Sequence, residues 1–338
     1  MTFLHRRRLA PLALAATAAV ALAACSSGGD TGAEADGGGP EKPDLTIAIN
    51  PSSQFAPMYH GIETGIFEEE GLELEIVPQT DVAAIVSGVA SGEYDFGFAT
   101  VVHVITAASN GIPIRAVTTI EGQIQADDEG TVTIAAEDSG ITDFADLAGK
   151  RLGVIGLSSH NTLTTWELAE RAGVDPASIE LVQLPFGQMA AALENGDVDA
   201  AVMQWPFAQD ALDAGGVPLG YNNREIFEDT ATTFINTSQQ FIDQNPNTVQ
   251  AFSDAMVASI EAANEDPDAA RESLVSGMGM SEEEAQSARW NIGGDPHLNI
   301  TAFERTQDLL VKFGDESEAA AVEDLDVATL VWPGALEE

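Results

Sequence analysis

The side chains best suited to chemistry in this sequence are hydroxyls and amides at points where a predicted strand leads into a predicted helix. The clearest case is Gly156–Thr162. Backbone N–H groups at a helix start lack intrahelical partners, and with nearby hydroxyls they can hold an anion without a formal positive charge. Ser158 and Ser159 can also be plain helix caps, and the two roles are compatible. His160 and Asn161 complete this candidate group, although a first-turn histidine can simply face solvent.

Similar loops follow the other predicted strands. Ligands of open α/β sheets bind outside the carboxyl ends of the strands, so these loops are expected to meet at one site. The indole of Trp205 can either stack on a flat ligand or pack at a hinge. The candidate ligand-binding residues from these loops are Asn50, Ser53, Gln54, Phe55, Thr100, Gln188, Gln204 and Trp205.

Catalytic signatures are absent from the sequence. It has no G-x-S-x-G, no H-E-x-x-H, no Walker loop and no G-x-G-x-x-G after a predicted strand. The five histidines have no metal-ligand spacing, and the acidic run 127–129 is typical of a solvated turn. Cys25 is the single cysteine, so an internal disulfide or a cysteine metal cluster cannot form. We therefore predict a protein that is not an enzyme and that uses no cofactor and no metal.

Length, hydrophobic content and net charge limit the classes of protein to which this chain can belong. A chain of 338 residues with 44% hydrophobic residues can bury one large core or two of ordinary size. Lys and Arg number 13 against 55 Asp and Glu, a formal net charge of -42. A surface this acidic repels phosphate, which argues against nucleic-acid binding and favours a soluble, non-adherent body.

The N-terminus has the pattern of an export signal. Arg6–Arg8 precede the uncharged run Leu9–Ala24, which is shorter than the ~20 residues of a membrane span, and Cys25 follows. The pattern resembles a bacterial lipoprotein signal, in which the cysteine is lipidated after cleavage. An ordinary secretory signal with a chance cysteine, or a twin-arginine route, are the alternatives. We expect a signal peptide at 1–25 and a flexible Gly/Ser-rich tether at 26–43.

The body of the chain alternates strands and helices. This alternation predicts an α/β fold with mostly parallel sheets covered by helices on both faces. After about residue 235 the pattern becomes mostly helical. The expected strands are 45–49, 72–77, 94–99, 112–120, 131–136, 151–156, 179–184 and 199–204, and the expected helices include 57–70, 81–91, 100–109, 158–172 and 188–194.

Four segments in order resemble one family of proteins. They are Pro57-Met58-Tyr59 through Gly65-Ile66-Phe67-Glu68-Glu69-Glu70-Gly71-Leu72, Ser91-Gly92-Glu93-Tyr94-Asp95-Phe96-Gly97, Asp146-Leu147-Ala148-Gly149-Lys150-Arg151-Leu152-Gly153-Val154 and Glu194-Asn195-Gly196-Asp197-Val198-Asp199-Ala200-Ala201-Val202. Together they resemble the sulfonate, nitrate, taurine and thiamine-pyrimidine-precursor group of solute-binding proteins of bacterial ABC importers. Their glycines and aspartates also suit helix ends and strand starts, so the segments themselves mark architecture.

The resemblance implies a two-lobed periplasmic-binding-protein-like fold of type II. Lobe one would be 44–122 plus 230–338, and lobe two 123–229. The cleft between them would capture a small solute: a sulfonate, a nitrate-like anion, a pyrimidine precursor or another small heterocycle. The implied partners are an ABC permease and ATPase, with a lipid anchor holding a monomer on the outer side of the cell membrane.

Charge inclines the expected ligand toward a neutral, flat or zwitterionic solute. Arg115 resembles a structural position of the family, and no other Lys or Arg falls in a loop expected to line the cleft. An acidic protein also slows an incoming anion.

Two other functions remain open at this stage. One is an enzyme of thiamine-pyrimidine or menaquinone synthesis on the same fold. The pyrimidine enzyme of this group uses a pyridoxal cofactor and carries a cysteine-rich motif, which this chain lacks, and an export signal argues against the cytosolic menaquinone role. The other is a lipoprotein that senses a solute without transporting it.

Overall fold

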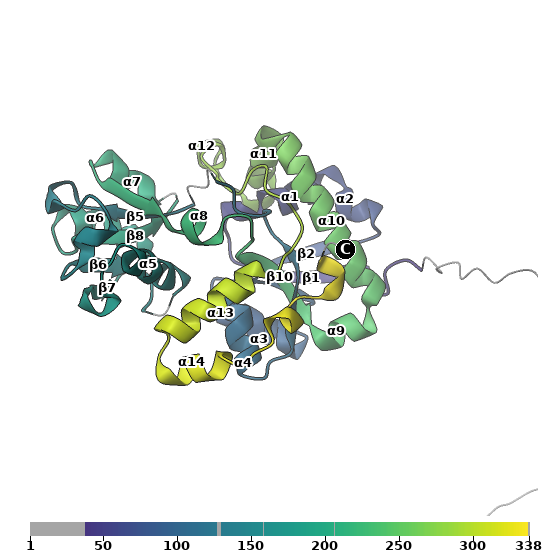
Figure 1. Cartoon of the computed structure of the whole chain (residues 1–338). Coiled ribbons are helices and arrows are strands. Elements are labelled where there is room, and N and C mark those ends of the chain that lie inside the picture. Colours follow the sequence, from purple (N-terminus) through teal and green to yellow (C-terminus); the bar gives the residue numbers. More distant parts are fainter. Residues whose placement is uncertain (1–37, 127–129, 158, 206, 337–338) are drawn as a thin grey trace, which may run out of the picture. The chain divides into compact units, whose positions relative to one another are not determined.

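The computed structural model describes residues 38–126, 130–157, 159–205 and 207–336 (Figure 1). Residues 38–338 form one compact unit. Cys25, the predicted signal peptide, tether residues 26–37 and the candidate ligand-binding residue Ser158 lie outside the described residues. Among the helices described, none is both long and apolar enough to span a bilayer.

Sheet one has the strand order β2-β1-β3-β10-β4. Its strands are β1 (Asp44–Ile49), β2 (Glu73–Pro78), β3 (Phe96–Thr100), β4 (Ile114–Thr119) and β10 (Thr233–Ser238). β1 pairs in parallel with β2 and β3, whereas β10 runs antiparallel to β3 and β4. Four strands therefore point one way and β10 opposes them.

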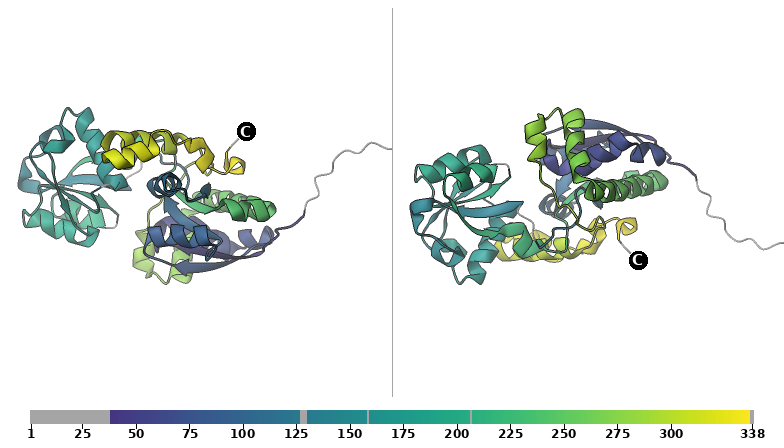
Figure 2. Two further views of the ribbon diagram at one scale, coloured as in Figure 1. Left: turned by 90° about the horizontal axis from the view of Figure 1, so that it is seen from below. Right: turned by 90° about the horizontal axis from the view of Figure 1, so that it is seen from above.

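Sheet two repeats this plan with the order β7-β6-β8-β5-β9. Its strands are β5 (Thr131–Ala135), β6 (Arg151–Val154), β7 (Glu180–Gln183), β8 (Ala200–Gln204) and β9 (Val217–Tyr221). β6 pairs in parallel with β7 and β8, and β5 is the opposing strand. Figure 2 shows helices on either side of these teal strands.

We call sheet one and its helices lobe one, and sheet two and its helices lobe two. Lobe two has α5 (His160–Arg171), α6 (Phe186–Glu194), α7 (Phe207–Asp213) and α8 (Asn222–Phe227). Lobe one has α1 (Ala56–Thr64), α2 (Ile66–Glu69), α3 (Val82–Ser91), α4 (Val101–Ser109), α9 (Gln239–Gln244), α10 (Pro246–Glu265), α11 (Pro267–Met278), α12 (Glu282–Gln286), α13 (Thr301–Phe313) and α14 (Glu316–Val322). Short 3₁₀ helices are η1 (Ser53–Phe55), η2 (Glu137–Ser139), η3 (Phe144–Leu147), η4 (Pro176–Ser178), η5 (Val327–Leu330) and η6 (Pro333–Ala335).

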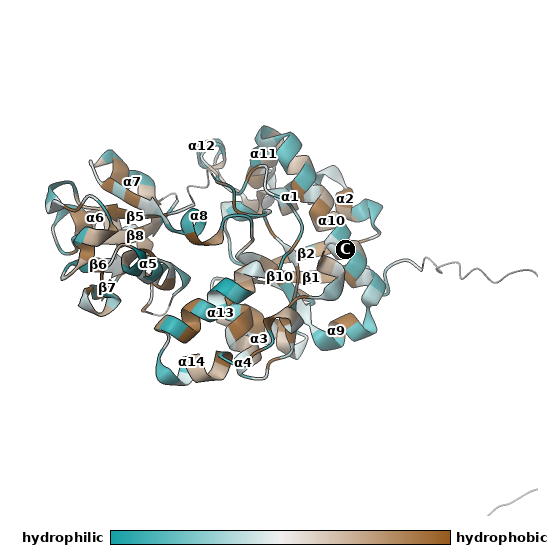
Figure 3. Ribbon diagram, in the orientation of Figure 1, coloured by the Kyte–Doolittle hydropathy of each residue, from teal (hydrophilic) through white to brown (hydrophobic). Residues whose placement is uncertain are grey.

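The predicted fold class, two lobes of mostly parallel sheet with flanking helices, is confirmed. The predicted helix 57–70 is wrong in one detail, because Gly65 takes a left-handed conformation (φ 83°) and divides it into α1 and α2. Asp81 caps α3 by accepting hydrogen bonds from the backbone N–H groups of Ala83 and Ala84. Hydrophilic and hydrophobic residues both occur along α13 (Figure 3), and this helix also contacts α5 and α8 of lobe two.

The sequence pattern did not predict two of the strands, β9 and β10. β9 contains a proline and a glycine and forms an edge, so its pattern is weak. β10 is an interior strand of sheet one, between β3 and β4, and five of its six residues are buried. It nevertheless begins where the sequence pattern becomes mostly helical. The chain thus crosses from sheet one to sheet two between β4 and β5, and returns between β9 and β10.

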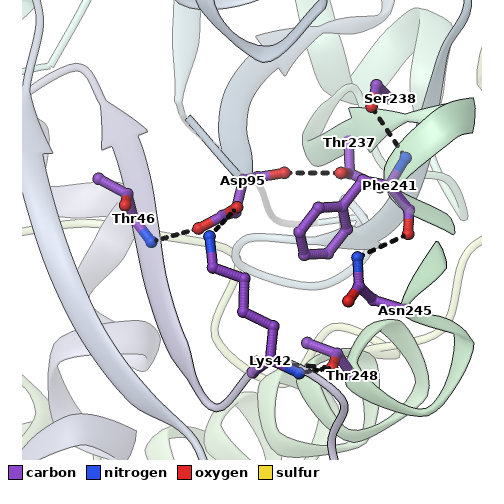
Figure 4. Close-up of polar contacts among 8 residues, drawn as sticks. All are labelled: Lys42, Thr46, Asp95, Thr237, Ser238, Phe241, Asn245 and Thr248. Atoms are coloured by element: carbon purple, nitrogen blue, oxygen red, sulfur yellow. Dashed lines mark hydrogen bonds and ion pairs between the residues drawn. The ribbon is translucent and has the colours of Figure 1, made fainter. Parts of the chain in front are cut away.

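Side-chain hydrogen bonds also join the strand starts of sheet one. Asp95, just before β3, accepts hydrogen bonds from the Thr46 backbone N–H and the Lys42 ammonium, and its backbone carbonyl accepts one from Thr237 (Figure 4). Phe241 packs 6.0 Å from that ammonium. These bonds fasten the beginning of β1 to β3 and β10.

Candidate functional site

A cavity of about 830 Å³ is lined by residues of both lobes. Lobe two contributes the end of β8 and the start of β5 with the first turns of α7 and α8. Lobe one contributes η1, the segment after β4, Arg271 on α11 and residues 286–292. The lining residues are Ser52, Ser53, Gln54, Glu121, Ile124, Gln125, Gly130, Thr131, Gln204, Trp205, Phe207, Gln209, Asp210, Asn223, Thr232, Arg271, Gln286, Ser287, Ala288, Arg289, Trp290, Asn291 and Ile292.

Glu121 organises the lobe-one side of the cavity. It is 4% exposed. One carboxylate oxygen accepts from Gln54 Nε2 at 2.9 Å and Thr233 Oγ1 at 3.3 Å, and the other accepts from the Asn291 backbone N–H at 3.2 Å. A buried carboxylate needs such donors to offset its lost hydration. Glu121 therefore ties η1, β10 and the 291 loop into one surface.

Close backbone contact fixes that loop. Gly122 has φ 85°, and a Cβ there would lie 2.8 Å from the carbonyl oxygen of Gly294. The Gln123 N–H donates to the Asp295 carbonyl at 2.8 Å, and Asn291 Nδ2 donates to the Gly122 carbonyl at 3.3 Å. The irregular segment after β4, which crosses toward lobe two, thereby holds the segment around Asn291 in the cavity wall.

Two arginines stand in the cavity wall, each stacked on an indole. The Arg289 guanidinium lies 4.1 Å from the ring centroid of Trp205, and that of Arg271 lies 5.2 Å from Trp290. Arg271 also donates to Asp268 Oδ1 at 2.9 Å and to the Ala288 carbonyl at 3.4 Å. The expectation that no basic side chain besides Arg115 would stand near the cleft is therefore wrong, because the chain returns to lobe one after β9 and places both arginines there.

The remaining wall is apolar or amide-bearing. Phe207 of lobe two is 41% exposed and Ile292 of lobe one is 38% exposed, an unusual exposure for large hydrophobic side chains. Trp290 is 8% exposed, and its indole Nε1 has no hydrogen-bond partner. Aromatic, apolar, amide and guanidinium groups together can bind a small organic molecule without breaking its bonds.

Four of the predicted ligand residues line this cavity. They are Ser53, Gln54, Gln204 and Trp205. Gln204 Nε2 lies 3.5 Å from Thr131 Oγ1, and Ser53 Oγ donates to the Arg289 carbonyl at 3.4 Å. Strand-end loops of both sheets do meet here, as the argument from α/β topology requires.

Three other predicted residues on lobe one stand away from the cavity lining. Asn50 keeps a buried Oδ1 without a hydrogen-bond partner. Phe55 is fully buried and packs edge-to-face on Phe98, with ring centroids 5.6 Å apart. Thr100 Oγ1 lies 2.7 Å from His103 Nδ1. Phe55 thus contributes to the core beneath η1.

The helix-start segment of lobe two is occupied by its own contacts. Ser159 caps α5 by accepting from the Thr162 N–H. His160 stacks on Phe227 at 4.9 Å and lies 2.9 Å from Asn223 Oδ1; burial lowers the pKa of His160 from 6.5, against that hydrogen bond. Asn161 is 4% exposed and lines no part of the cavity, and Gln188 on α6 is exposed outside it. The link to the cavity runs through Asn223, which does line it.

The functional residues that sequence reasoning missed come mainly from residues 271–292. They carry no strand-to-helix signal, since Arg271 lies on α11, Gln286 lies on α12 and residues 287–292 follow α12, in a stretch predicted as mostly helical. A pattern of arginine near tryptophan, as in Arg289-Trp290, was the one local signal present.

Comparisons with known proteins show which family this chain resembles. The profile of the family described as NMT1/THI5 like matches residues 52–270. Over 145 residues the chain is 30% identical to the 4-amino-5-hydroxymethyl-2-methylpyrimidine phosphate synthase of Legionella pneumophila, covering 42% of this chain and 44% of that protein, so it spans less than half of that relative. Over 238 residues it is 24% identical to the synthase THI12 of Saccharomyces cerevisiae, covering 66% of this chain and 68% of that protein.

Among solved structures, the periplasmic aliphatic sulphonate binding protein SsuA from Escherichia coli is similar with a TM-score of 0.71. The two sequences are 17% identical, and the match covers 88% of this chain and 94% of that one. At this identity the likeness concerns the fold.

Proposed function

Since the chain belongs to the NMT1/THI5-like family, we propose that it is the substrate-binding lipoprotein of an ABC importer. It captures a small organic solute in the cavity between its lobes and delivers it to a membrane permease driven by an ATPase. The observation that carries the proposal is the 830 Å³ cavity walled by both lobes, because a solute that contacts both can favour their closure. The sulphonate-binding neighbour supports the same use of the fold.

The synthase names of the sequence relatives make an enzyme the rival function. A pyridoxal cofactor is held as a Schiff base by a lysine. This chain has three lysines, Lys42, Lys150 and Lys312, and none lines the cavity. Lys42 pairs with Asp95, and Lys312 pairs with Glu167 and Glu170. The residues present therefore do not fit a pyridoxal group, which favours binding over synthesis.

Capture without conversion is tested by a thermal-shift screen of the purified full chain against sulfonates, nitrate, pyrimidines and other small heterocycles. A true ligand at a hundred times its Kd stabilises the folded state by about 2.7 kcal/mol and raises Tm. Mass spectrometry should then recover the ligand unchanged. Covalent conversion of a hit would instead establish the enzyme.

We further propose that Cys25 is lipidated, which keeps the protein on the outer side of the cell membrane. The basic n-region, the short apolar run and the single cysteine support it. The variant Cys25→Ser should move from the membrane fraction to the soluble fraction, whereas the wild-type chain stays with the membrane. Equal membrane retention of both proteins would contradict the anchor.

A further inference from the structure

One wall of the cavity lies beyond the segment that the family profile matches. The family match ends at residue 270. The C-terminal wall, as we call it, consists of Arg271, Gln286, Ser287, Ala288, Arg289, Trp290, Asn291 and Ile292. Because these residues stand outside the matched region, the ligand of a relative does not transfer to this chain, and the C-terminal wall must be interpreted from its own chemistry.

We propose that the C-terminal wall makes the site selective for an organic anion with an aromatic body. Arg271 and Arg289 pair with the anionic group, while the ring packs against Trp205, Phe207 and Ile292. This inference rests on the proposed function, since it names the class of solute that the cavity captures.

The charges of the wall carry the first step. In a chain with 13 basic and 55 acidic residues, the cavity lining nevertheless includes two arginines beside two acids, Glu121 and Asp210. Arg271 pairs with Asp268 through Nη1, and a guanidinium has five N–H donors, so it can bind an anion beside that contact. A guanidinium suits a carboxylate or sulfonate because its N–H groups match two oxygens at once.

Unused donors carry the second step. The Arg271 side chain is 19% exposed, and its Nη2 donates no hydrogen bond among the described residues. Nε1 of the adjoining Trp290 is a buried donor without an acceptor. Donors without acceptors in a partly dry wall favour a ligand rich in acceptor oxygens.

Exposed apolar surface carries the third step. Phe207 and Ile292 belong to a small set of large hydrophobic side chains with high exposure, and both face this cavity from opposite lobes. A ligand with an apolar body would cover them, whereas an inorganic anion would leave them in water. The indole of Trp205 adds a flat surface for a ring.

The test is a calorimetric titration of the full chain with matched probes. The aromatic anions are benzenesulfonate, 4-toluenesulfonate and benzoate; methanesulfonate and nitrate lack the ring, and benzenesulfonamide lacks the charge. We expect the tightest aromatic anion to bind at least about tenfold more tightly than either control class, because charged hydrogen bonds and ring burial each contribute on the order of one to three kcal/mol.

Arginine variants then test which side chains bind the anionic group. Arg289→Gln and Arg271→Gln should each weaken binding of the aromatic anion about tenfold to a hundredfold, and the Lys variants less. Arg224→Gln is the matched control, because its guanidinium also stacks on an aromatic ring, Tyr221 at 4.5 Å, but does not line the cavity. If Arg271→Gln fails to fold, the exposed Arg289 still provides the test.

The outcomes separate this inference from the proposed function. Binding of neutral heterocycles with no binding of any aromatic anion overturns the selectivity but leaves the receptor. Equal affinities for benzenesulfonate and benzenesulfonamide, or unchanged binding by both Arg→Gln variants, also overturn it. Chemical conversion of any bound probe would overturn the receptor itself.

Discussion

The two lobes share one strand topology but differ in the side chains that pack in their cores. In each, a central strand pairs in parallel with the strand that follows it and with a third strand, beside which an opposing strand is inserted. The registers correspond: Phe96 of β3 pairs with Ile47, and Ala200 of β8 pairs with Leu152. The same strand position therefore carries a phenylalanine in lobe one and an alanine in lobe two.

The plan includes the same polar bond at the strand starts. Asp199 precedes β8 as Asp95 precedes β3, and it accepts from the backbone N–H, Nε and Nη2 of Arg151. The hydrogen bonds from the Arg151 side chain lower the pKa of Asp199. The repetition indicates that the aspartates of the family-like segments hold strands together in both lobes, away from the ligand.

The side chains at these positions differ because the strands of lobe one pack against a long helix. Phe96 stacks on Phe252 of the 20-residue helix α10, with ring centroids 4.2 Å apart, and Phe241 packs edge-on at 5.3 Å. Two residues further along each strand, Phe98 of lobe one corresponds to Val202 of lobe two. The helices of lobe two are shorter, and its strand β8 carries an alanine and a valine at these two positions.

The largest expected effect tests this difference in filling. Phe96→Ala should lower the free energy of unfolding by about 3–5 kcal/mol, because it removes a fully buried ring and leaves a cavity. Val202→Ala in lobe two should cost about 2 kcal/mol. Urea denaturation followed by circular dichroism measures both.

Phe207→Ala is the control for loss of an aromatic ring, since the side chain is 41% exposed and the change should stay within about 0.5 kcal/mol. A cost for Val202→Ala that equals or exceeds that for Phe96→Ala would remove the contrast between the lobes.

How far the sequence predicts this molecule also differs between its parts. The strands β1 to β8 and the helices between them follow from local periodicity and from glycines at helix ends. β10 does not, because its position is set by pairing with β3 and β4, more than a hundred residues earlier. An interior antiparallel strand supplied by a distant segment leaves no local signature.

The candidate site divides in the same way. Gln54, Gln204 and Trp205 could be predicted because strand ends of a parallel sheet converge. Arg271 and Arg289 could not, because only the return of the chain to lobe one brings them to the cavity. Phe55 shows the opposite error, since a loop position alone does not tell a core side chain from one that faces a ligand.

A smaller effect compares the histidines of the two lobes. Burial lowers the pKa of both His160 and His103 from 6.5, so each favours the neutral form in the folded protein. For such a group the stabilisation is complete above the unfolded value and is lost as the pH falls through the folded value. Asp81 raises the pKa of His103 against burial, whereas among the described residues no carboxylate raises the pKa of His160.

Acid should therefore destabilise the protein more through lobe two. Between about pH 7.5 and 5.5, His160→Gln should reduce the loss of unfolding free energy relative to wild type, and His103→Gln should reduce it less. Urea midpoints at the two pH values measure the change, and the His103→Gln chain serves as the matched control. A pH dependence that His160→Gln leaves intact would mean that the ring remains as well hydrated in the folded protein as in the unfolded chain, and that its stacking on Phe227 does not exclude water.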